Sequence, residues 1–218
     1  MIPTGTAMGS TKERILLAAK DRFLRDGFAG ASVDDLVEEL SISKKTFYKC
    51  FESKDDLLAE IVELIIRELD LGFQAILSSD ESFVEKLDAL MMFVGRQIGR
   101  IVRPFMFDLQ RHAPHLWRRV LEFRRSRMAV NIQSLFQEGI RGGYIRQEIN
   151  TRILLLAFVG TVESIMIPSL LANESFSADE AMRSILRIYF HGILTDDAGK
   201  QLRTVQNNPS RSLPYGAP

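Results

Sequence analysis

Residues 32–58 read SVDDLVEELSISKKTFYKCFESKDDLL. Ser32, Ser43 and Ser53 each precede a run whose apolar residues have helical spacing. A serine in that position caps a helix, because its hydroxyl accepts a hydrogen bond from a free backbone N–H. Acidic pairs follow the first and third serines, where they suit the positive end of the helix dipole. The stretch therefore predicts two short helices and the start of a third longer one, joined by tight turns.

Helical patterns continue on both sides of this stretch. Upstream, Thr11 is predicted to cap a helix that ends at Gly27, because glycine takes a left-handed C-terminal conformation without penalty. Downstream, helices are predicted at residues 53–77, 81–101, 105–111, 116–141, 151–171 and 178–194, with proline- or glycine-containing breaks between several of them. Strand signals are nearly absent. The expected fold class is all-α, with an N-terminal three-helix helix-turn-helix domain followed by a larger helical domain.

The same patterns predict a division of the chain. Residues 1–10 are expected to be a flexible arm, since they lack the basic region and apolar run of a secretory signal. Residues 11–56 form the predicted helix-turn-helix domain and residues 57–195 the larger helical domain. Residues 196–218 lose helical periodicity and are predicted to be a mobile tail.

Charge and cysteine content exclude several classes of protein. Lysine plus arginine number 28 and aspartate plus glutamate number 28, so the net charge is zero, which excludes a protein that coats nucleic acid over its whole surface. The single cysteine rules out an internal disulfide and favours a reducing, cytoplasmic compartment. Glu163 lies near the middle of the most apolar stretch, residues 153–172, and disfavours a membrane span there.

A compact basic patch is nevertheless present. Residues 41–54 hold four lysines against one glutamate. A helix-turn-helix places its second helix in the DNA major groove, where lysine and hydroxyl side chains hold phosphates or read bases. The alternative is a set of small core helices with a solvated lysine face. The pattern alone leaves both interpretations open.

The stretch also resembles the helix-turn-helix signature of TetR-type transcriptional regulators. The positions that fit in order are Ser32, Ile42, Ser43, Thr46, Phe47, Tyr48, Phe51, Ser53, Lys54 and Leu57. Upstream, the run that includes Ala18, Phe23, Gly27 and Phe28 resembles the first helix of the family, so the resemblance covers about residues 11–58. Three positions depart from the pattern: Ser41 often is glycine in the family, Lys45 a small residue and Cys50 tyrosine.

The resemblance implies roles for individual residues. The residues implied to hold backbone phosphates are Ser32, Thr46, Tyr48 and Lys54. Those implied to face the groove are Lys44, Lys45 and Lys49, and Ser43, which caps their helix, completes the predicted DNA-binding set. Because Lys45 departs from the family pattern, we expect it to alter which DNA sequence is read.

The resemblance further implies a homodimer and a small-molecule effector. The predicted dimer helices are residues 152–171 and 178–194, and the alternative is that both helices fill the core of one monomer. Residues suggested for a ligand pocket are Met92, Gln97, Phe105, His112, Trp117, Phe123 and Glu163. For Glu163, a position in the dimer interface is an equally good interpretation.

Two other features are assigned to ordinary structure. Residues 111–127 hold six arginines against one glutamate, and we expect solvation or pairing with acids of residues 60–88 rather than a second nucleic-acid surface. The chain has no HExxH, CxxC, glycine-rich phosphate loop or GxSxG motif, so neither catalysis nor a metal or cofactor is expected.

The predicted function is a homodimeric DNA-binding repressor released by a small apolar ligand. The alternatives are a regulator without a ligand and a helical interaction protein that does not bind DNA.

Overall fold

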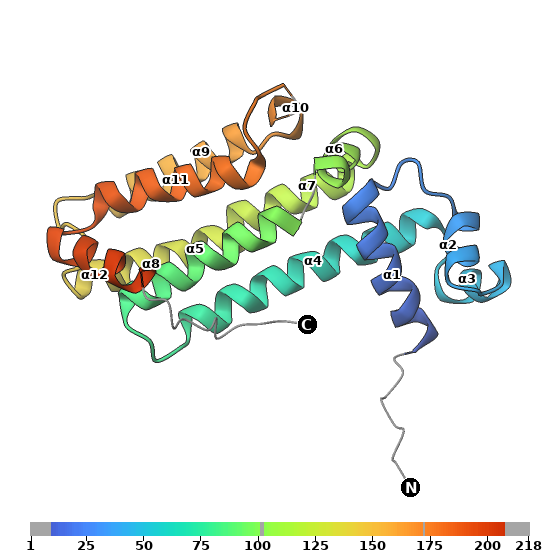
Figure 1. Ribbon diagram of the computed structural model, residues 1–218, viewed down its shortest axis with the longest axis horizontal. Helices are drawn as coiled ribbons and strands as arrows, with labels where there is room; N and C mark the ends of the chain where they lie inside the picture. The colour runs from blue at the N-terminus through green and yellow to red at the C-terminus, as the bar shows by residue number, and fades with distance from the viewer. Residues whose placement is uncertain (1–9, 101–102, 172, 208–218) are drawn as a thin grey trace, which may run out of the picture.

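The computed structural model describes residues 10–100, 103–171 and 173–207 of the chain. These residues form helices, and their only strand-like pairing is an isolated bridge between Ile145 and Leu194. The all-α prediction is therefore confirmed. Three short helices gather at one end of the molecule, and a long helix leads from them into a bundle (Figure 1).

The predicted serine caps are present at the N-terminal end. The helices there are α1 (Thr11–Asp26), α2 (Val33–Glu39), α3 (Lys44–Cys50) and the long α4 (Lys54–Leu77). Ser32, Ser43 and Ser53 each accept a hydrogen bond from the backbone N–H three residues later. The cap of α1 is Ser10 rather than Thr11, because it is the Ser10 hydroxyl that accepts from the Glu13 amide, at 3.2 Å.

The remaining helices form the bundle and its link to the head. They are α5 (Phe83–Arg100), α6 (Arg103–His112), α7 (Pro114–Phe123), η1 (Arg124–Met128), α8 (Ala129–Arg141), α9 (Thr151–Ile165), α10 (Pro168–Leu171), α11 (Ala178–Ile193) and α12 (Asp196–Gln206). The predicted helix 116–141 is interrupted by the π-turn η1. The predicted helix 151–171 ends at Ile165, and a new short helix begins at Pro168, whose ring removes a backbone donor and disfavours helical continuation.

The predicted mobile tail is partly wrong. Residues 196–206 form α12, which packs against α5 and buries Ala198 and Leu202. Two apolar residues four positions apart are enough to bury one face of a short helix, although they are too few to give a clear sequence pattern. Residues 208–218 of that prediction, and residues 1–9 of the predicted arm, lie outside the described part of the chain.

Two hydrophobic cores share the long helix α4. The head core combines α1–α3 and α4 up to Ile66 with the buried residues Phe105, Leu109, Leu116 and Phe123 of α6 and α7. The body core begins at Phe73 on α4 and joins α5, α8, α9, α11 and α12. The head core thus takes in side chains well beyond residue 56, the predicted end of the helix-turn-helix domain.

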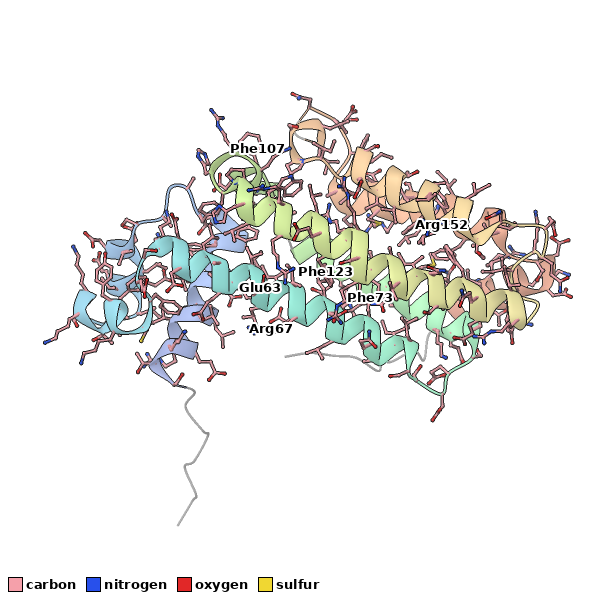
Figure 2. All side chains as sticks on the ribbon, turned by 180° about the vertical axis from the view of Figure 1, so that it is seen from behind. Glu63, Arg67, Phe73, Phe107, Phe123 and Arg152 are labelled. Carbon is pink, nitrogen blue, oxygen red and sulfur yellow. The ribbon has the colours of Figure 1, made fainter. Side chains whose placement is uncertain are left out.

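Two side chains, Leu69 and Met128, pack against both cores. Figure 2 shows Phe73 on α4 and Phe123 on the neighbouring α7, one from each core.

Among the described residues, no helix has the length and hydropathy needed to cross a bilayer.

Candidate nucleic-acid interface and effector cavity

The turn between α2 and α3 is closed by backbone hydrogen bonds. Ser41 N donates to Glu38 O at 3.0 Å, and Ile42 N donates to Val37 O at 2.9 Å. Ser41 has a φ of +52°, the one positive value at a non-glycine position in the described residues. A small polar residue therefore occupies the left-handed position, where glycine carries no steric penalty. The turn is tight enough to bring α3 directly against α2.

The short helix α3 separates an apolar side from a polar side. Phe47 is completely buried in the head core and packs against Phe51, with ring centroids 5.8 Å apart. Lys45 and Lys49 are exposed, and Tyr48 is 54% exposed. The structure therefore brings the predicted groove-facing lysines and Tyr48 together on one outward surface, as a recognition helix requires.

Lys44 shares this surface and also has a partner on α2. Its Nζ lies 2.8 Å from Asp34 Oδ1, and this hydrogen bond raises the pKa of Lys44. Both side chains are more than half exposed, so the pair adds little stability in water. A phosphate or a guanine edge can therefore replace Asp34 as the partner of Lys44 at small cost.

Ser32 begins α2 with a reciprocal pair of hydrogen bonds. Its Oγ accepts from Asp35 N at 3.1 Å, while its own N donates to Asp35 Oδ2 at 2.8 Å. The backbone N–H of Ser32 thereby lowers the pKa of Asp35. Because the Ser32 hydroxyl accepts in this contact, its proton is still available to a phosphate oxygen.

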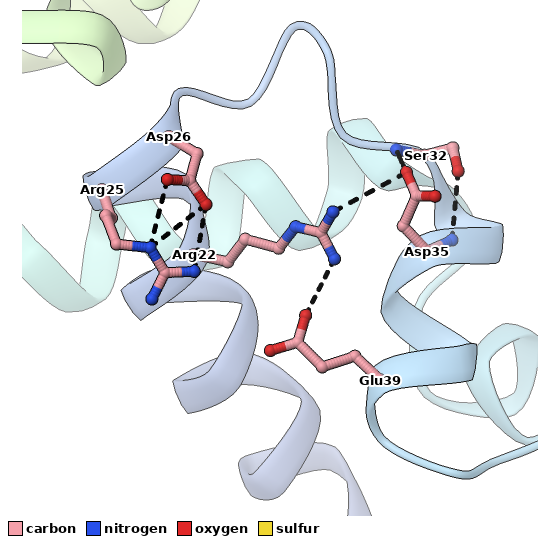
Figure 3. A network of polar contacts seen from close by, with 6 residues as sticks. All are labelled: Arg22, Arg25, Asp26, Ser32, Asp35 and Glu39. Atoms are coloured by element: carbon pink, nitrogen blue, oxygen red, sulfur yellow. Dashed lines mark hydrogen bonds and ion pairs between the residues drawn. The ribbon is translucent and has the colours of Figure 1, made fainter.

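Arg22 of α1 holds the same helix from the side. Its Nη1 lies 2.8 Å from Glu39 Oε2, and its Nη2 lies 3.9 Å from Asp35 Oδ2 (Figure 3). These contacts join α1 to both ends of α2. The orientation of α2 in the head is therefore set by side chains as well as by the apolar core.

Ser43 and Thr46 form a compact pair at the start of α3. Ser43 Oγ accepts from Thr46 N at 3.0 Å and lies 2.9 Å from Thr46 Oγ1. One hydroxyl donates to the other in this contact, so one hydroxyl proton of the pair remains for an outside acceptor. The N-terminal end of α3 thus presents a hydroxyl donor beside Lys44 and Lys45.

Lys54 has different surroundings from the lysines of α3. Its Nζ lies 5.8 Å from the centre of the Phe28 ring, and burial lowers the pKa of Lys54. It stands in the first turn of α4, beside the loop between α1 and α2, rather than on the outward surface of α3. The sequence did not reveal a further group at this loop, Asp108 of α6, whose carboxylate accepts from two loop amides.

An apolar cavity of about 40 Å³ lies in the body core. Its lining comes from Phe73, Leu90, Val94, Arg124, Met128, Ile132, Leu135, Phe158, Val159, Val162, Glu163, Met182, Leu186 and Phe190. Of the residues suggested for a ligand pocket, Glu163 is the one in this lining. Its carboxylate accepts two hydrogen bonds from Arg125, at 2.6 and 3.1 Å, so its charge is paired within the chain.

The structure places the other suggested pocket residues elsewhere. Phe105 and Phe123 are buried in the head core, and Trp117 packs against that core with the Arg124 guanidinium 5.8 Å from its ring centre. His112 ends α6, and Gln97 lies on α5 outside the cavity lining. Met92 lines a separate open groove of about 740 Å³ bordered by α5 and α11. Phe105, Trp117 and Phe123 lie away from the cavity because α6 and α7 pack their aromatic side chains against the head core.

The arginine-rich segment forms ion pairs, as predicted for it. Arg119 Nε lies 2.6 Å from Glu63 Oε1, and Arg127 Nη1 lies 3.4 Å from Asp70 Oδ2. Both acids belong to α4, and Figure 2 shows Glu63 on that helix. These pairs join α7 and η1 to α4, which runs on into the head.

Helices α9 and α11 have an apolar surface on the side opposite the body core. Ile153 and Leu156 of α9 are 65% and 58% exposed, and Ile188 of α11 is 70% exposed. Gly160 and Gly192 lie on the same helices, and a Cβ added at either one would meet nothing within 4 Å. Each helix thus fills the core with one face. The outer side of α9 is largely apolar, whereas on α11 the exposed Ile188 stands among Arg183, Arg187 and His191. Elsewhere in the described chain, no cluster of histidine, cysteine and acidic residues is arranged to hold a metal ion.

Comparison with known proteins places these features in a family. Residues 15–61 match the model for "Bacterial regulatory proteins, tetR family". The chain is 22% identical over 186 residues to the uncharacterized HTH-type transcriptional regulator YvaF of Bacillus subtilis, covering 85% of this chain and 97% of that one.

Solved structures extend the likeness to the larger domain. A transcriptional regulator of the TetR/AcrR family from Thermobifida fusca is 25% identical, with a TM-score of 0.61 over 83% of this chain and 97% of that one. SmeT of Stenotrophomonas maltophilia is 16% identical, with a TM-score of 0.65 over 96% and 98% of the two chains. The buried Phe47, the tight turn at Ser41 and the outward lysines of α3 therefore form a helix-turn-helix like that of the TetR family of DNA-binding transcriptional regulators, and the chain as a whole shares the fold of those regulators.

Proposed function

We propose that this regulator is a homodimeric repressor that leaves its operator when a small, largely apolar molecule enters the body core. The observation that carries the DNA-binding part is the outward surface of α3, where Lys44, Lys45, Tyr48 and Lys49 stand opposite the buried Phe47. Lysine at the start of a recognition helix favours guanine O6 and N7 in the major groove. In this proposal Ser32, Ser43, Thr46 and Lys54 contribute contacts around the backbone phosphates.

The exposed apolar residues of α9 and α11 support the dimer. Exposed Ile153, Leu156 and Ile188 lose contact with water when a second copy covers them, and burial of apolar area is the main favourable term in association. The open surfaces at Gly160 and Gly192 let two helices approach closely. Two heads in one dimer then read two half-sites, about 34–36 Å apart on the same face of the duplex.

The apolar cavity supports the effector part of the proposal. Its present volume of about 40 Å³ is small beside the few hundred Å³ that a drug-sized ligand needs, so a ligand must widen it. Such a ligand favours a body conformation with a larger cavity, and release follows if the two heads of that conformation no longer match the half-sites. Met128, which lines the cavity and also packs against the head core, links the two regions.

The repressor part draws on a protein with a similar fold. SmeT is described as the repressor of the multidrug efflux pump SmeDEF of Stenotrophomonas maltophilia. Repression by this chain is the corresponding proposal. A reporter gene placed behind the chain's own upstream region tests it, since a repressor lowers expression and an activator raises it.

Two lysine substitutions test the DNA-binding surface. DNA selected by the chain from a random library serves as the probe. Lys54→Ala should weaken binding to every selected sequence and reduce the slope of log K against log salt by about 1, as loss of one phosphate contact requires. Lys45→Ala should instead change the preferred base at one position, with a discrimination of about 1–3 kcal/mol lost there.

Lys200→Ala is the matched control, because Lys200 is an exposed lysine on α12, far along the chain from the head. It removes the same charge and should leave both affinity and preference unchanged. Unaltered binding by both head variants would contradict the assigned surface. A chain that selects no DNA sequence at all would favour a helical interaction protein.

The effector part has its own test. A library of small molecules is screened for compounds that raise the midpoint of thermal unfolding, and each hit is then added to the complex with DNA. Hits that stabilise the protein and release DNA support the proposal. Stable DNA binding with no stabilising compound favours a regulator that works without a small ligand.

A further inference from the structure

The loop between α1 and α2 is held by a side chain from a distant part of the sequence. Asp108 of α6 accepts hydrogen bonds on Oδ2 from the backbone N–H groups of Phe28 and Ala29, both at 2.8 Å. These two residues lie 80 and 79 positions before Asp108. The bonds are charge-assisted, and such bonds are about twice as strong as neutral ones.

The neighbouring residues are shaped around this contact. Gly27 ends α1 with a φ of +80°, and a Cβ added there would stand 2.6 Å from Asp108 Oδ2. Glycine is therefore required at position 27 both by the backbone conformation and by the approach of the carboxylate. The ring of Phe28 is buried and packs edge-on against Phe105 of α6, with centroids 6.1 Å apart.

The held loop leads directly into the DNA-binding surface. Ser32, the cap of α2, follows Ala29 by three residues, and Lys54 lies over the ring of Phe28. A shift of the loop therefore moves the start of α2 and the surroundings of Lys54 together. Because α3 packs on α2, its lysines move with them.

We propose that Asp108 is a positioning residue for DNA binding: from α6 it fixes the loop in front of α2 and thereby the placement of the reading helices. Asp108 itself lies outside the DNA-binding surface proposed above, and its role rests on that proposal. With Asp108 removed, the two amides bond to water and the loop samples further conformations. Only a fraction of molecules then holds α2 and α3 in the binding geometry, and the apparent affinity falls by that fraction.

The position of α6 gives this contact a second consequence. Helix α6 packs against α1 on one side and against α10 on another, and α10 follows the body helix α9 along the chain. A displacement of α10 therefore reaches the head through α6 and Asp108, in addition to the direct route along α4.

Two independent measurements on the full-length chain test the proposal. Hydrogen exchange followed by NMR reports on the amides of Phe28 and Ala29, and DNA selected from a random library reports on affinity. Asp108→Ala should raise the exchange rates of both amides about tenfold or more and weaken DNA binding about tenfold. Asp108→Asn should lie between the unaltered chain and Asp108→Ala in both, because its amide oxygen still accepts hydrogen bonds but without the charge that strengthens them.

The sign of the effect separates positioning from electrostatics. Removing a negative charge near a DNA-binding surface strengthens binding by charge alone, whereas the loss of positioning weakens it. Asp197→Ala, an exposed acid on α12, controls for the general change of net charge and should leave affinity unchanged. The salt dependence of binding by Asp108→Ala should keep its slope, because no phosphate contact is lost directly.

A second control separates positioning from stability. Ile145→Val deletes one methyl group from the body core and lowers the midpoint of thermal unfolding without touching the head. Equal weakening of DNA binding by this variant and by Asp108→Ala, or unchanged exchange of Phe28 and Ala29 in Asp108→Ala, would overturn the proposal. If the unaltered chain selects no DNA, the proposed DNA-binding surface is wrong. Slow exchange of the Phe28 and Ala29 amides that depends on Asp108 would still show that Asp108 fixes the loop.

Discussion

Ser41 adopts a sterically unfavourable backbone conformation in the turn between α2 and α3. Its φ of +52° lies in the left-handed region, which costs an L-residue about 1–2 kcal/mol. Glycine removes this cost and adds about 0.5–1 kcal/mol of backbone entropy loss on folding. We therefore expect Ser41→Gly to raise the free energy of unfolding by about 0.5–1 kcal/mol, measured by urea denaturation.

A second serine gives the control for that substitution. Ser78 caps the C-terminal end of α4 with a φ of −88°, where serine already has an ordinary conformation. Ser78→Gly relieves no strain and should leave the protein equally or less stable. A lower unfolding midpoint for Ser41→Gly would show that the serine side chain does more in the turn than occupy it.

At the residue scale, the sequence predicted what depends on near neighbours. The caps at Ser32, Ser43 and Ser53 bond to amides three residues away, so a short stretch contains the whole contact. The partners of Asp108 and Glu163 lie 80 and 38 residues away, and no local pattern points to them. Glu163 lies in an apolar stretch of the sequence, and folding supplies Arg125 as its partner.

Helix α12 gives a test at the element scale. Leu202 is 2% exposed and belongs to the body core, although it lies in a segment without clear periodicity. Leu202→Ala should lower the free energy of unfolding by about 2–5 kcal/mol, the usual cost of truncating a buried leucine. Thermal or urea denaturation provides the measurement, and the neighbouring exposed Gln201→Ala should change stability by less than about 0.5 kcal/mol. A loss for Leu202→Ala as small as that of the control would mean that α12 contributes little to the body core.

The locations of most elements were predictable because capping and breaking residues act locally. Gly27 ends α1 and Ser53 caps α4 as their chemistry requires. The position of the π-turn at 124–128 was not predictable, because no glycine or proline marks it in the sequence. The cavity was likewise unpredictable, since it depends on which face of α5 meets α9 and α11.

At the scale of the whole molecule, the outer face of α9 and α11 carries the proposed contact between two copies of the chain. Gly160→Leu places a bulky side chain where the monomer has open space, so the monomer should keep its stability or gain up to about 0.8 kcal/mol of helix propensity. The same side chain prevents close approach of a second copy and should weaken the dimer at least about tenfold, or about 1.4 kcal/mol. Sedimentation at micromolar concentration measures the change.

Gln201→Leu provides the comparison, because it adds the same side chain to the exposed surface of α12. It should leave the dimer intact. Full dimerisation of Gly160→Leu would place the contact between copies elsewhere on the molecule and would remove the support that the apolar face gives to the proposed dimer.

Helix α4 carries both cores in one unbroken run of 24 residues. Ile66 faces the head core and Phe73 the body core, seven residues or about two turns apart, so they point to nearly the same side of the helix. A single residue inserted between them would turn everything before it by about 100° relative to everything after it. The length of α4 is therefore fixed in steps of whole turns. A replacement changes the contacts of one residue, whereas an insertion or deletion that does not restore whole turns rotates one core relative to the other.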